Sequence, residues 1–194
     1  MTILDLIQML ASLAKNHRKR VVTLAELCRL CAQTPAAVAM TLLRAQKKNI
    51  VGRAGNVWIN LMDRPTVEEV AFALEGPSYI SFESALYHHG ILSQSPRGAL
   101  TVATCGRPRL VHTPLGPIRF THLKGDLFFG YDKTRMALAE KAWLDLLYVR
   151  GRKGEEIPET LYLDTMNRKR LKQFARSFPR MVQRLITNTG GQSE

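Results

Sequence analysis

The sequence is poor in features that would assign it to several large classes of protein. It has only three cysteines among 194 residues, an odd number that argues against a disulfide-stapled secreted domain. No apolar run approaches the roughly 20 residues that span a bilayer. The first residues, MTILDLIQMLASLAK, lack an early basic segment and alternate apolar with polar residues at helical spacing, unlike a signal peptide. We therefore expect a reduced, cytoplasmic protein without a membrane partner.

Acidic residues are also scarce: 16 Asp and Glu stand against 28 Lys and Arg, a formal net charge of +12. A chain this basic is expected to meet a polyanion, most often nucleic acid, with anionic membrane the weaker alternative. The excess of basic over acidic residues is distributed unevenly along the chain. Residues 1–62 carry nine basic and two acidic side chains, residues 63–149 carry nine of each, and residues 150–194 carry ten and five. This distribution indicates a modular protein with localised polyanion contacts; the other interpretation is a generally basic protein.

The local signals in residues 1–62 predict three short helices and a hairpin. Apolar positions recur at helical spacing over residues 3–14. Thr23 and Glu26 form a capping box that begins a second helix near Leu24. Thr34 followed by proline begins a third helix, which runs to about Lys48.

The stretch NIVGRAGNVWIN then predicts two short strands around a turn at residues 53–56. The connection between the second and third helices is tight, as a helix-turn-helix requires. We therefore predict a winged helix-turn-helix DNA-binding domain over residues 1–62. A small helical cap without a ligand is the alternative.

The third helix supplies most of the candidate DNA contacts. Val38, Leu42 and Ala45 are spaced to face the core, so side chains opposite them would face DNA. In such docking the start of the recognition helix meets base edges and flanking charges meet phosphates. The predicted DNA-binding residues are Thr34, Ala37, Met40, Thr41, Arg44, Lys47 and Lys48 of this helix, Arg53 of the wing, and the basic cluster Arg18, Lys19 and Arg20.

These side chains differ in the contacts that their chemistry allows. Ala37, Met40 and Thr41 are suited to thymine methyls or to close approach to bases. Arg44 is suited to guanine or phosphate, and the lysines and Arg53 to phosphate. The alternative for each lysine is an ordinary solvated surface charge.

The rest of the chain predicts an α+β domain over residues 66–186 and a flexible tail over 187–194. A helix is expected at about Val67–Leu74. The runs LTVATC, RLVHTPLG, IRFTHL and LFFGYD alternate and are punctuated by Gly and Pro, which predicts a small antiparallel sheet. MALAEKAWLDLLYVRG returns to helical spacing, and another helix is expected at about Asn167–Phe178.

The stretch YISFESALYHHGIL, residues 79–92, concentrates reactive residue types. Ser81 is suited to an N-cap and Gly90 to a C-terminal stop, which predicts a helix over residues 82–89. The two histidines in it are adjacent, so they point about 100° apart around a helix. No third group orients a nucleophile. Cys28 and Cys31 lie inside a predicted helix without further ligands at zinc spacing. We therefore expect no catalytic residues, no metal and no cofactor, and a protein that is not an enzyme.

Two motifs in this half resemble the AbiEi antitoxin family, the regulators of AbiE-type toxin–antitoxin and phage-defence systems. The first is Tyr-(Ile/Val)-Ser-x-x-Ser-Ala-Leu-x-x-x-Gly, matched by Tyr79, Ser81, Ser84, Ala85, Leu86 and Gly90. The second is Ala-x-x-Glu-Lys-Ala-x-Leu-Asp, matched by Ala137, Glu140, Lys141, Ala142, Leu144 and Asp145. With the winged-helix start, the resemblance covers nearly the whole chain.

The resemblance implies an N-terminal domain that binds double-stranded operator DNA and represses the system's own operon. Our hypothesis for its mechanism includes two protomers on repeated half-sites as one arrangement. It also implies a C-terminal domain that antagonises a nucleotidyltransferase-like toxin. We expect Glu140, Lys141 and Asp145 to form a buried ion network that holds helix to sheet. A stand-alone transcriptional regulator and a protein- or RNA-binding adaptor remain alternatives.

Overall fold

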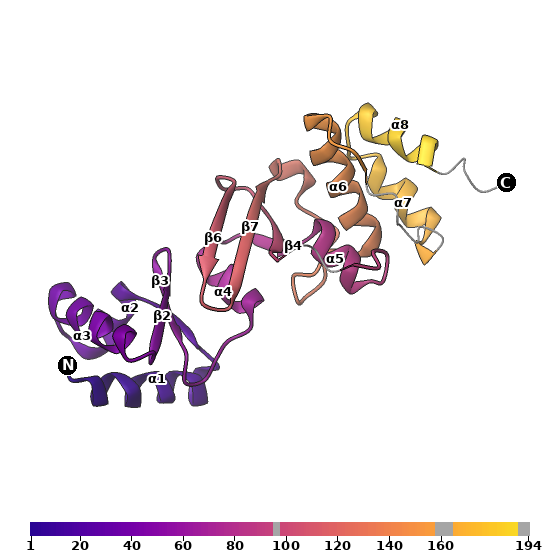
Figure 1. Ribbon diagram of the computed structural model, residues 1–194. Helices are drawn as coiled ribbons and strands as arrows, with labels where there is room; N and C mark the ends of the chain where they lie inside the picture. Colours follow the sequence, from indigo (N-terminus) through magenta and orange to yellow (C-terminus); the bar gives the residue numbers. More distant parts are fainter. Residues whose placement is uncertain (95–97, 158–164, 190–194) are drawn as a thin grey trace. The chain divides into compact units, whose positions relative to one another are not determined.

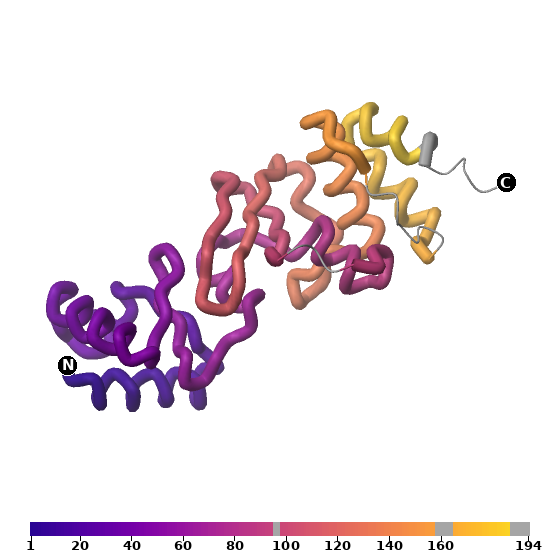
Figure 2. Tube along the Cα trace, in the orientation of Figure 1, coloured from indigo at the N-terminus to yellow at the C-terminus, as the bar shows by residue number. Residues whose placement is uncertain are grey.

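The computed structural model describes residues 1–94, 98–157 and 165–189, traced in Figures 1 and 2. The chain divides into two compact units. One contains Met1–Gly76 with Leu110–Ile118, and the other contains Pro77–Arg109 with Arg119–Glu194. The division at residue 76 follows a helix that the predicted boundaries placed in the second domain.

The first unit begins with three helices and a three-stranded sheet (Figure 1). The strand order is β1-β3-β2, and both pairs are antiparallel. This succession of helices and hairpin is that of a winged helix-turn-helix. A further helix follows the sheet. The elements are α1 (Ile3–His17), β1 (Val21–Thr23), α2 (Leu24–Cys31), α3 (Pro35–Lys47), β2 (Val51–Ala54), β3 (Val57–Asn60) and α4 (Val67–Leu74).

Local sequence signals fix where these helices begin. Thr23 and Glu26 form the predicted capping box of α2, in which each side chain accepts from the other residue's backbone amide. Thr34 accepts from the amide of Ala37, with proline at the first turn of α3. Helix α2 ends at Cys31, and the next residue, Ala32, adopts a left-handed conformation with φ of 50°. The turn before α3 is therefore as tight as predicted. Strand β1 was not predicted, because three residues are too few to show an alternating pattern.

One apolar core joins the three helices to the sheet. Its members come from every element of the winged helix: Leu6, Leu10, Val22, Leu27, Val38, Leu42, Ala45, Val51 and Trp58. Val38, Leu42 and Ala45 are fully buried, which confirms the predicted core-facing row of α3. This packing fixes the rotation of α3 about its axis.

The second half of the chain combines a sheet with helices (Figure 1). It begins with a strand and a short helix and ends with three helices. The elements of this half of the chain are β4 (Ser78–Ile80), α5 (Phe82–His88), β5 (Leu100–Thr104), β6 (Arg109–Thr113), β7 (Gly116–His122), the 3-10 turn η1 (Gly125–Leu127), α6 (Ala139–Lys153), α7 (Arg168–Ala175) and α8 (Arg180–Thr189). The α+β class is thus confirmed. Residues 190–194 of the predicted tail lie outside the described ranges.

The sheet of this half corrects two predictions. Its strand order is β4-β5-β7-β6, and it is mixed rather than wholly antiparallel. After β5 the chain forms β6 at the far edge of the sheet and then returns as β7, which lies between β5 and β6. The ends of β5 and β7 therefore lie side by side, and the amide of Leu123 donates to the carbonyl of Thr104 there. The predicted strand LFFGYD is also wrong. Its residues form η1 and a loop with one bridge, between Tyr131 and Ala137.

Helix α6 is the centre of the second unit. Nine consecutive residues, from Glu140 to Tyr148, are buried. A helix buried on all sides needs neighbours all round, and α5, α7 and α8 each pack against it. Three ionisable residues, Glu140, Lys141 and Asp145, are buried with it.

The packing of α3 predicts opposite effects for two adjacent leucines. Leu42→Ala removes a fully buried side chain and should lower the free energy of unfolding by about 2–5 kcal/mol. Leu43→Ala is the matched control, because Leu43 is 43% exposed, and should change it by less than about 1 kcal/mol. Urea denaturation of both variants measures the difference. Equal losses would show that α3 is rotated from the position described.

Candidate nucleic-acid interface

Helix α3 exposes one row of side chains along its length. Ala36, Met40, Leu43 and Lys47 follow one another at helical spacing and are all exposed, as is Arg44 beside them. The two large apolar members are unusually open, with Met40 52% and Leu43 43% exposed. The row begins apolar and ends cationic. Of the predicted contacts, Thr34, Ala37, Met40, Arg44, Lys47 and Lys48 are exposed on or beside it.

Thr41 does not belong to this face, which corrects the prediction. Its side chain is only 4% exposed. Its hydroxyl lies 2.9 Å from the carbonyl oxygen of Met1 and 3.1 Å from that of Ala37, its two acceptors. The start of the chain therefore covers this flank of α3. The exposed face is turned away from Thr41 and includes Ala36 and Leu43, which the sequence reasoning missed.

The cationic end of the row has little to neutralise it. Arg44, Lys47 and Lys48 are exposed, and the sequence contains no Asp or Glu between Glu26 and Asp63. Unlike the apolar residues before them, these side chains can reach phosphates. The positive charge of α3 is therefore local and uncompensated by its sequence neighbours.

The wing presents one further cation. Arg53 is exposed on β2, and its guanidinium carbon lies 5.6 Å from the centre of the Trp58 ring. Its Nε donates to the carbonyl oxygen of Gly55 at 3.3 Å. Gly55 has a φ of 55°, a conformation that the tight hairpin requires and that glycine adopts without strain. Arg53 is thus held along the wing with its charge in solvent.

The basic cluster after α1 is less available than predicted. Lys19 pairs with Glu26, the N3 residue of the α2 capping box, at 2.5 Å. Arg20 pairs with Asp63 at 2.9 Å and with Glu69 at 3.5 Å. The hydrogen bond from Arg20 to Asp63 raises the pKa of Arg20 further above its ordinary value. Arg18 is exposed, whereas Lys19 and Arg20 are half-buried.

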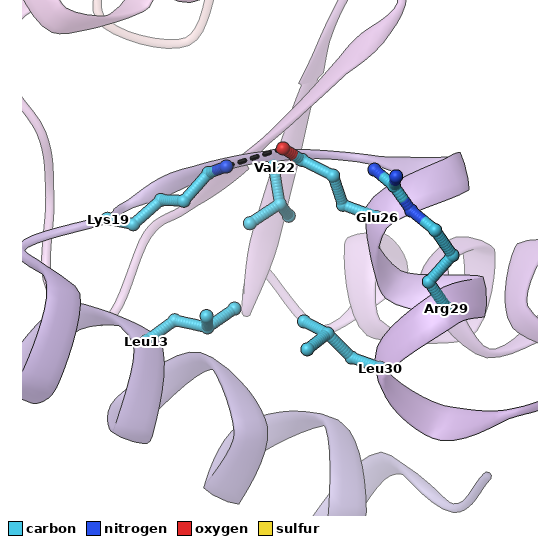
Figure 3. A pocket seen from close by; sticks show the side chains of 6 residues that line it. All are labelled: Leu13, Lys19, Val22, Glu26, Arg29 and Leu30. Carbon is cyan, nitrogen blue, oxygen red and sulfur yellow. Dashed lines mark hydrogen bonds and ion pairs between the residues drawn. The ribbon is translucent and has the colours of Figure 1, made fainter.

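The Lys19–Glu26 pair spans a small surface pocket (Figure 3). The pocket has a volume of about 230 Å³, below the roughly 300–1,000 Å³ of pockets that hold drug-sized ligands. Figure 3 shows two leucines facing each other below the ion pair. It is lined by Leu13, Lys19, Val22, Glu26, Arg29 and Leu30. The leucines thus give the ion pair an apolar floor.

In the second unit, the two family-like motifs meet in one buried network. Tyr79 and Ser81 donate their hydroxyl protons to Asp145 at 2.8 and 2.7 Å. Lys141 donates to the hydroxyl oxygen of Tyr79 at 2.8 Å and forms an ion pair with Asp145. Lys141 and Asp145 are both fully buried. Residues from distant parts of the sequence are thereby joined, as expected for an ion network that holds helix to sheet.

Burial and neighbouring charges shift the pKa values of all three ionisable groups of the network, Tyr79, Lys141 and Asp145. Burial raises the pKa of Asp145 and lowers that of Lys141, and the ion pair opposes both shifts. Burial and the neighbouring carboxylate raise the pKa of Tyr79, so it stays protonated. The Lys141 ammonium also lies 5.1 Å from the ring centres of Phe129 and Phe178, a favourable cation–π arrangement. These groups stabilise one another and offer no nucleophile to solvent.

The remaining motif residues position the same region. Ser81 stands at the predicted N-cap of α5, but it makes no capping bond because its hydroxyl is directed to Asp145. Ser84 instead joins α5 to β5, with its hydroxyl accepting from the amide of Thr101 at 2.8 Å. Ala85 and Leu86 are fully buried. Gly90 follows the helix with a φ of 70°, as its predicted role as a stop requires.

Glu140 ties α6 to α7. It is 3% exposed, and its carboxylate accepts from the amide of Asn167 at 2.8 Å and contacts Arg170 at 3.5 Å. Asn167 in turn caps α7. Glu140 therefore contacts α7, whereas Lys141 and Asp145 bond to each other, to Tyr79 and to Ser81. This corrects the prediction of a single network that also included Glu140.

The described residues contain no group of three or more His, Cys, Asp or Glu that could hold a metal. Cys28, Cys31 and Cys105 are free thiols. Within the described ranges, no helix has both the length and the apolar character needed to cross a bilayer.

Comparison with known proteins gives a likeness of fold. No protein-family model matches the chain, and no curated protein matches its sequence. Among solved structures, the crystal structure of the Rv2827c protein from Mycobacterium tuberculosis is similar, with a TM-score of 0.58 and 13% sequence identity. The match covers 90% of this chain and 72% of that one. At this identity the two share a fold, and the likeness carries nothing about ligands or partners.

The buried network predicts a pH-dependent defect. Asp145→Asn leaves Lys141 buried without a counter-charge and should lower the free energy of unfolding at pH 7 by about 3–5 kcal/mol. Because burial lowers the pKa of Lys141, the unfolded variant binds more protons than the folded one. Its stability should therefore rise with pH up to the ordinary lysine pKa of about 10.4. Urea denaturation at pH 7 and pH 9 measures both effects.

Tyr79→Phe serves as the control, because it removes the two hydrogen bonds of one neutral hydroxyl and keeps the ion pair. The free energy of unfolding of this variant should fall by less than that of Asp145→Asn, by about 1–3 kcal/mol. Replacing both charges, as Lys141→Met with Asp145→Leu, should recover part of the stability that Asp145→Asn loses. A stable Asp145→Asn protein with no dependence on pH would contradict this account of the network.

Proposed function

We propose that the protein is a sequence-specific DNA-binding transcriptional regulator that represses its own operon. The observation that carries this proposal is the exposed face of α3, which is the second helix of a helix-turn-helix and has an apolar start and a cationic end. Such a helix docks in the major groove with its first turns toward base edges. Arg44, Lys47 and Lys48 would then neutralise phosphates on either side.

The wing and the overall charge support the same function. Arg53 is held on β2 with its charge exposed, where a wing meets the adjacent phosphate backbone. The excess of basic side chains in residues 1–62 would attract DNA before any specific contact forms. Two protomers on repeated half-sites would give a symmetric operator.

We further propose that the regulator is an antitoxin of the AbiEi type, which antagonises a nucleotidyltransferase-like toxin. Both motifs that carry this resemblance contribute side chains to the network around the Asp145 carboxylate, which supports reading them as parts of one structural unit. A stand-alone regulator would need the same α3 face but no toxin partner. An RNA-binding adaptor would show no preference for operator DNA.

If the protein binds operator DNA, removing two exposed cations should lower its affinity for that DNA. Arg44→Ala with Lys48→Ala should weaken binding to the DNA upstream of the gene. The slope of log affinity against log salt should fall by about 0.9 for each phosphate that is no longer neutralised. Thermal stability should be nearly unchanged, because both side chains are exposed. Gel shifts at several salt concentrations measure the slope.

The matched control is Lys124→Ala with Lys133→Ala, which removes the same charge from two exposed positions outside residues 1–62. This control should bind operator as the unaltered protein does. If the unaltered protein gives no specific shift at any moderate salt concentration, the regulator function is wrong. If it prefers RNA to operator duplex, the adaptor alternative replaces it.

The antitoxin function predicts that rescue and repression separate. A cell that expresses the proposed nucleotidyltransferase-like toxin should be rescued both by the unaltered protein and by the variant with Arg44→Ala and Lys48→Ala, although only the former should repress a reporter. Growth and reporter output are measured together. Failure of the unaltered protein to rescue would favour a stand-alone regulator, and loss of rescue in the variant would place both functions on one surface.

A further inference from the structure

The first turns of α3 offer no exposed polar side chain. From Pro35 to Leu43 the sequence reads PAAVAMTLL, in which Thr41 is the single polar residue. Thr41 is buried, and its hydroxyl is bound to backbone carbonyls of Met1 and Ala37. A recognition helix usually reads bases with hydrogen bonds from Asn, Gln, Arg or Ser. Here that part of the helix presents only methyl, methylene and thioether groups.

Two of these apolar side chains are large and remain in solvent. Met40 and Leu43 are 52% and 43% exposed, and the smaller Ala36 and Ala37 lie exposed on the turn before them. Exposed apolar groups that lie together mark a contact surface. The cations Arg44, Lys47 and Lys48 adjoin them, so the surface that fits must be both anionic and locally apolar.

Duplex DNA combines these two properties at one kind of base. In the major groove the thymine C5-methyl is an apolar group on a base edge, and phosphates flank it on both sides. The alanines leave room for the helix to approach. Seven residues separate Ala36 from Leu43, which is about 10 Å along the helix and close to three base-pair steps.

We propose that Met40 and Leu43 are specificity-determining residues that read thymine methyl groups, and that each half-site of the operator presents two or three thymines to α3. This inference rests on the proposed function and adds the chemistry of its readout. Specificity then comes from burial of methyl groups, and affinity comes from the phosphate contacts of the adjoining cations.

The test removes only the methyl groups. Operator duplexes are prepared with single thymidines replaced by deoxyuridine, which keeps base pairing and loses the methyl. At two or three positions of each half-site the affinity should fall about fourfold per methyl, the equivalent of ~0.8 kcal/mol for one buried CH₂ group. The salt dependence should not change, because no phosphate contact is altered.

Protein variants assign the effect to the two side chains. In Met40→Ala and Leu43→Ala, binding to the thymine operator should weaken, and at one or more positions deoxyuridine should no longer reduce it further. Arg44→Ala is the matched control. It should keep the full difference between thymidine and deoxyuridine while its salt dependence falls.

Specific operator binding that tolerates deoxyuridine at every thymidine of the half-sites would overturn this inference and leave the proposed function standing. Persistence of the full deoxyuridine effect in both apolar variants would equally overturn the assignment to Met40 and Leu43. Unchanged operator binding by both variants would show that Met40 and Leu43 do not contact the operator and would also overturn this inference. Absence of any operator shift would remove the proposed function and the inference with it.

Discussion

The surface that α3 presents depends on one packing interaction, the burial of Val38, Leu42 and Ala45 against the core of the winged helix. A helix has no intrinsic preference for which side faces solvent, so this apolar row sets its rotation. The same rotation places Met40 and Leu43 outward and ends the exposed row in cations. The core therefore determines which chemistry is available for recognition, although none of its members is exposed.

The second unit depends on a different interaction, the buried pair of Lys141 and Asp145. A buried charge is tolerated only when it is paired and hydrogen-bonded, and Tyr79 and Ser81 supply the remaining bonds. The strand and turn that carry these hydroxyls are thus held against α6. Tyr79 and Ser81, which belong to the stretch of reactive residue types at residues 79–92, therefore have a structural role: with Lys141 and Asp145 they join β4 and the start of α5 to α6.

Features decided within a few residues could be predicted from the sequence, and features decided by distant segments could not. The capping residues Thr23 and Thr34 act on amides three positions away, and both helix starts are as predicted. Thr41 is covered by Met1, 40 residues earlier, and Arg20 is neutralised by Asp63, 43 residues later. The sheet is mixed because of the order of its strands. The alternation of apolar and polar residues predicts that a strand forms, but not which strand lies beside it. The exposed face of α3 could have been found in the sequence. A residue two positions before a buried residue lies about 200° from it around the helix axis, so the buried row of α3 places Ala36, Met40 and Leu43 on the opposite side.

The turn between β4 and α5 affects how the second unit unfolds locally. Ser81 directs its hydroxyl to Asp145 instead of capping α5, and Phe82 begins the helix in a left-handed conformation with φ of 55°. Such a residue costs about 1–2 kcal/mol and persists only where its surroundings enforce it. The first turn of α5 is therefore held by its surroundings, among them the bond from Ser81 to Asp145, and we expect this turn and the ion pair to open together. In hydrogen exchange, the amides of α5 and those around Asp145 would share a single opening event.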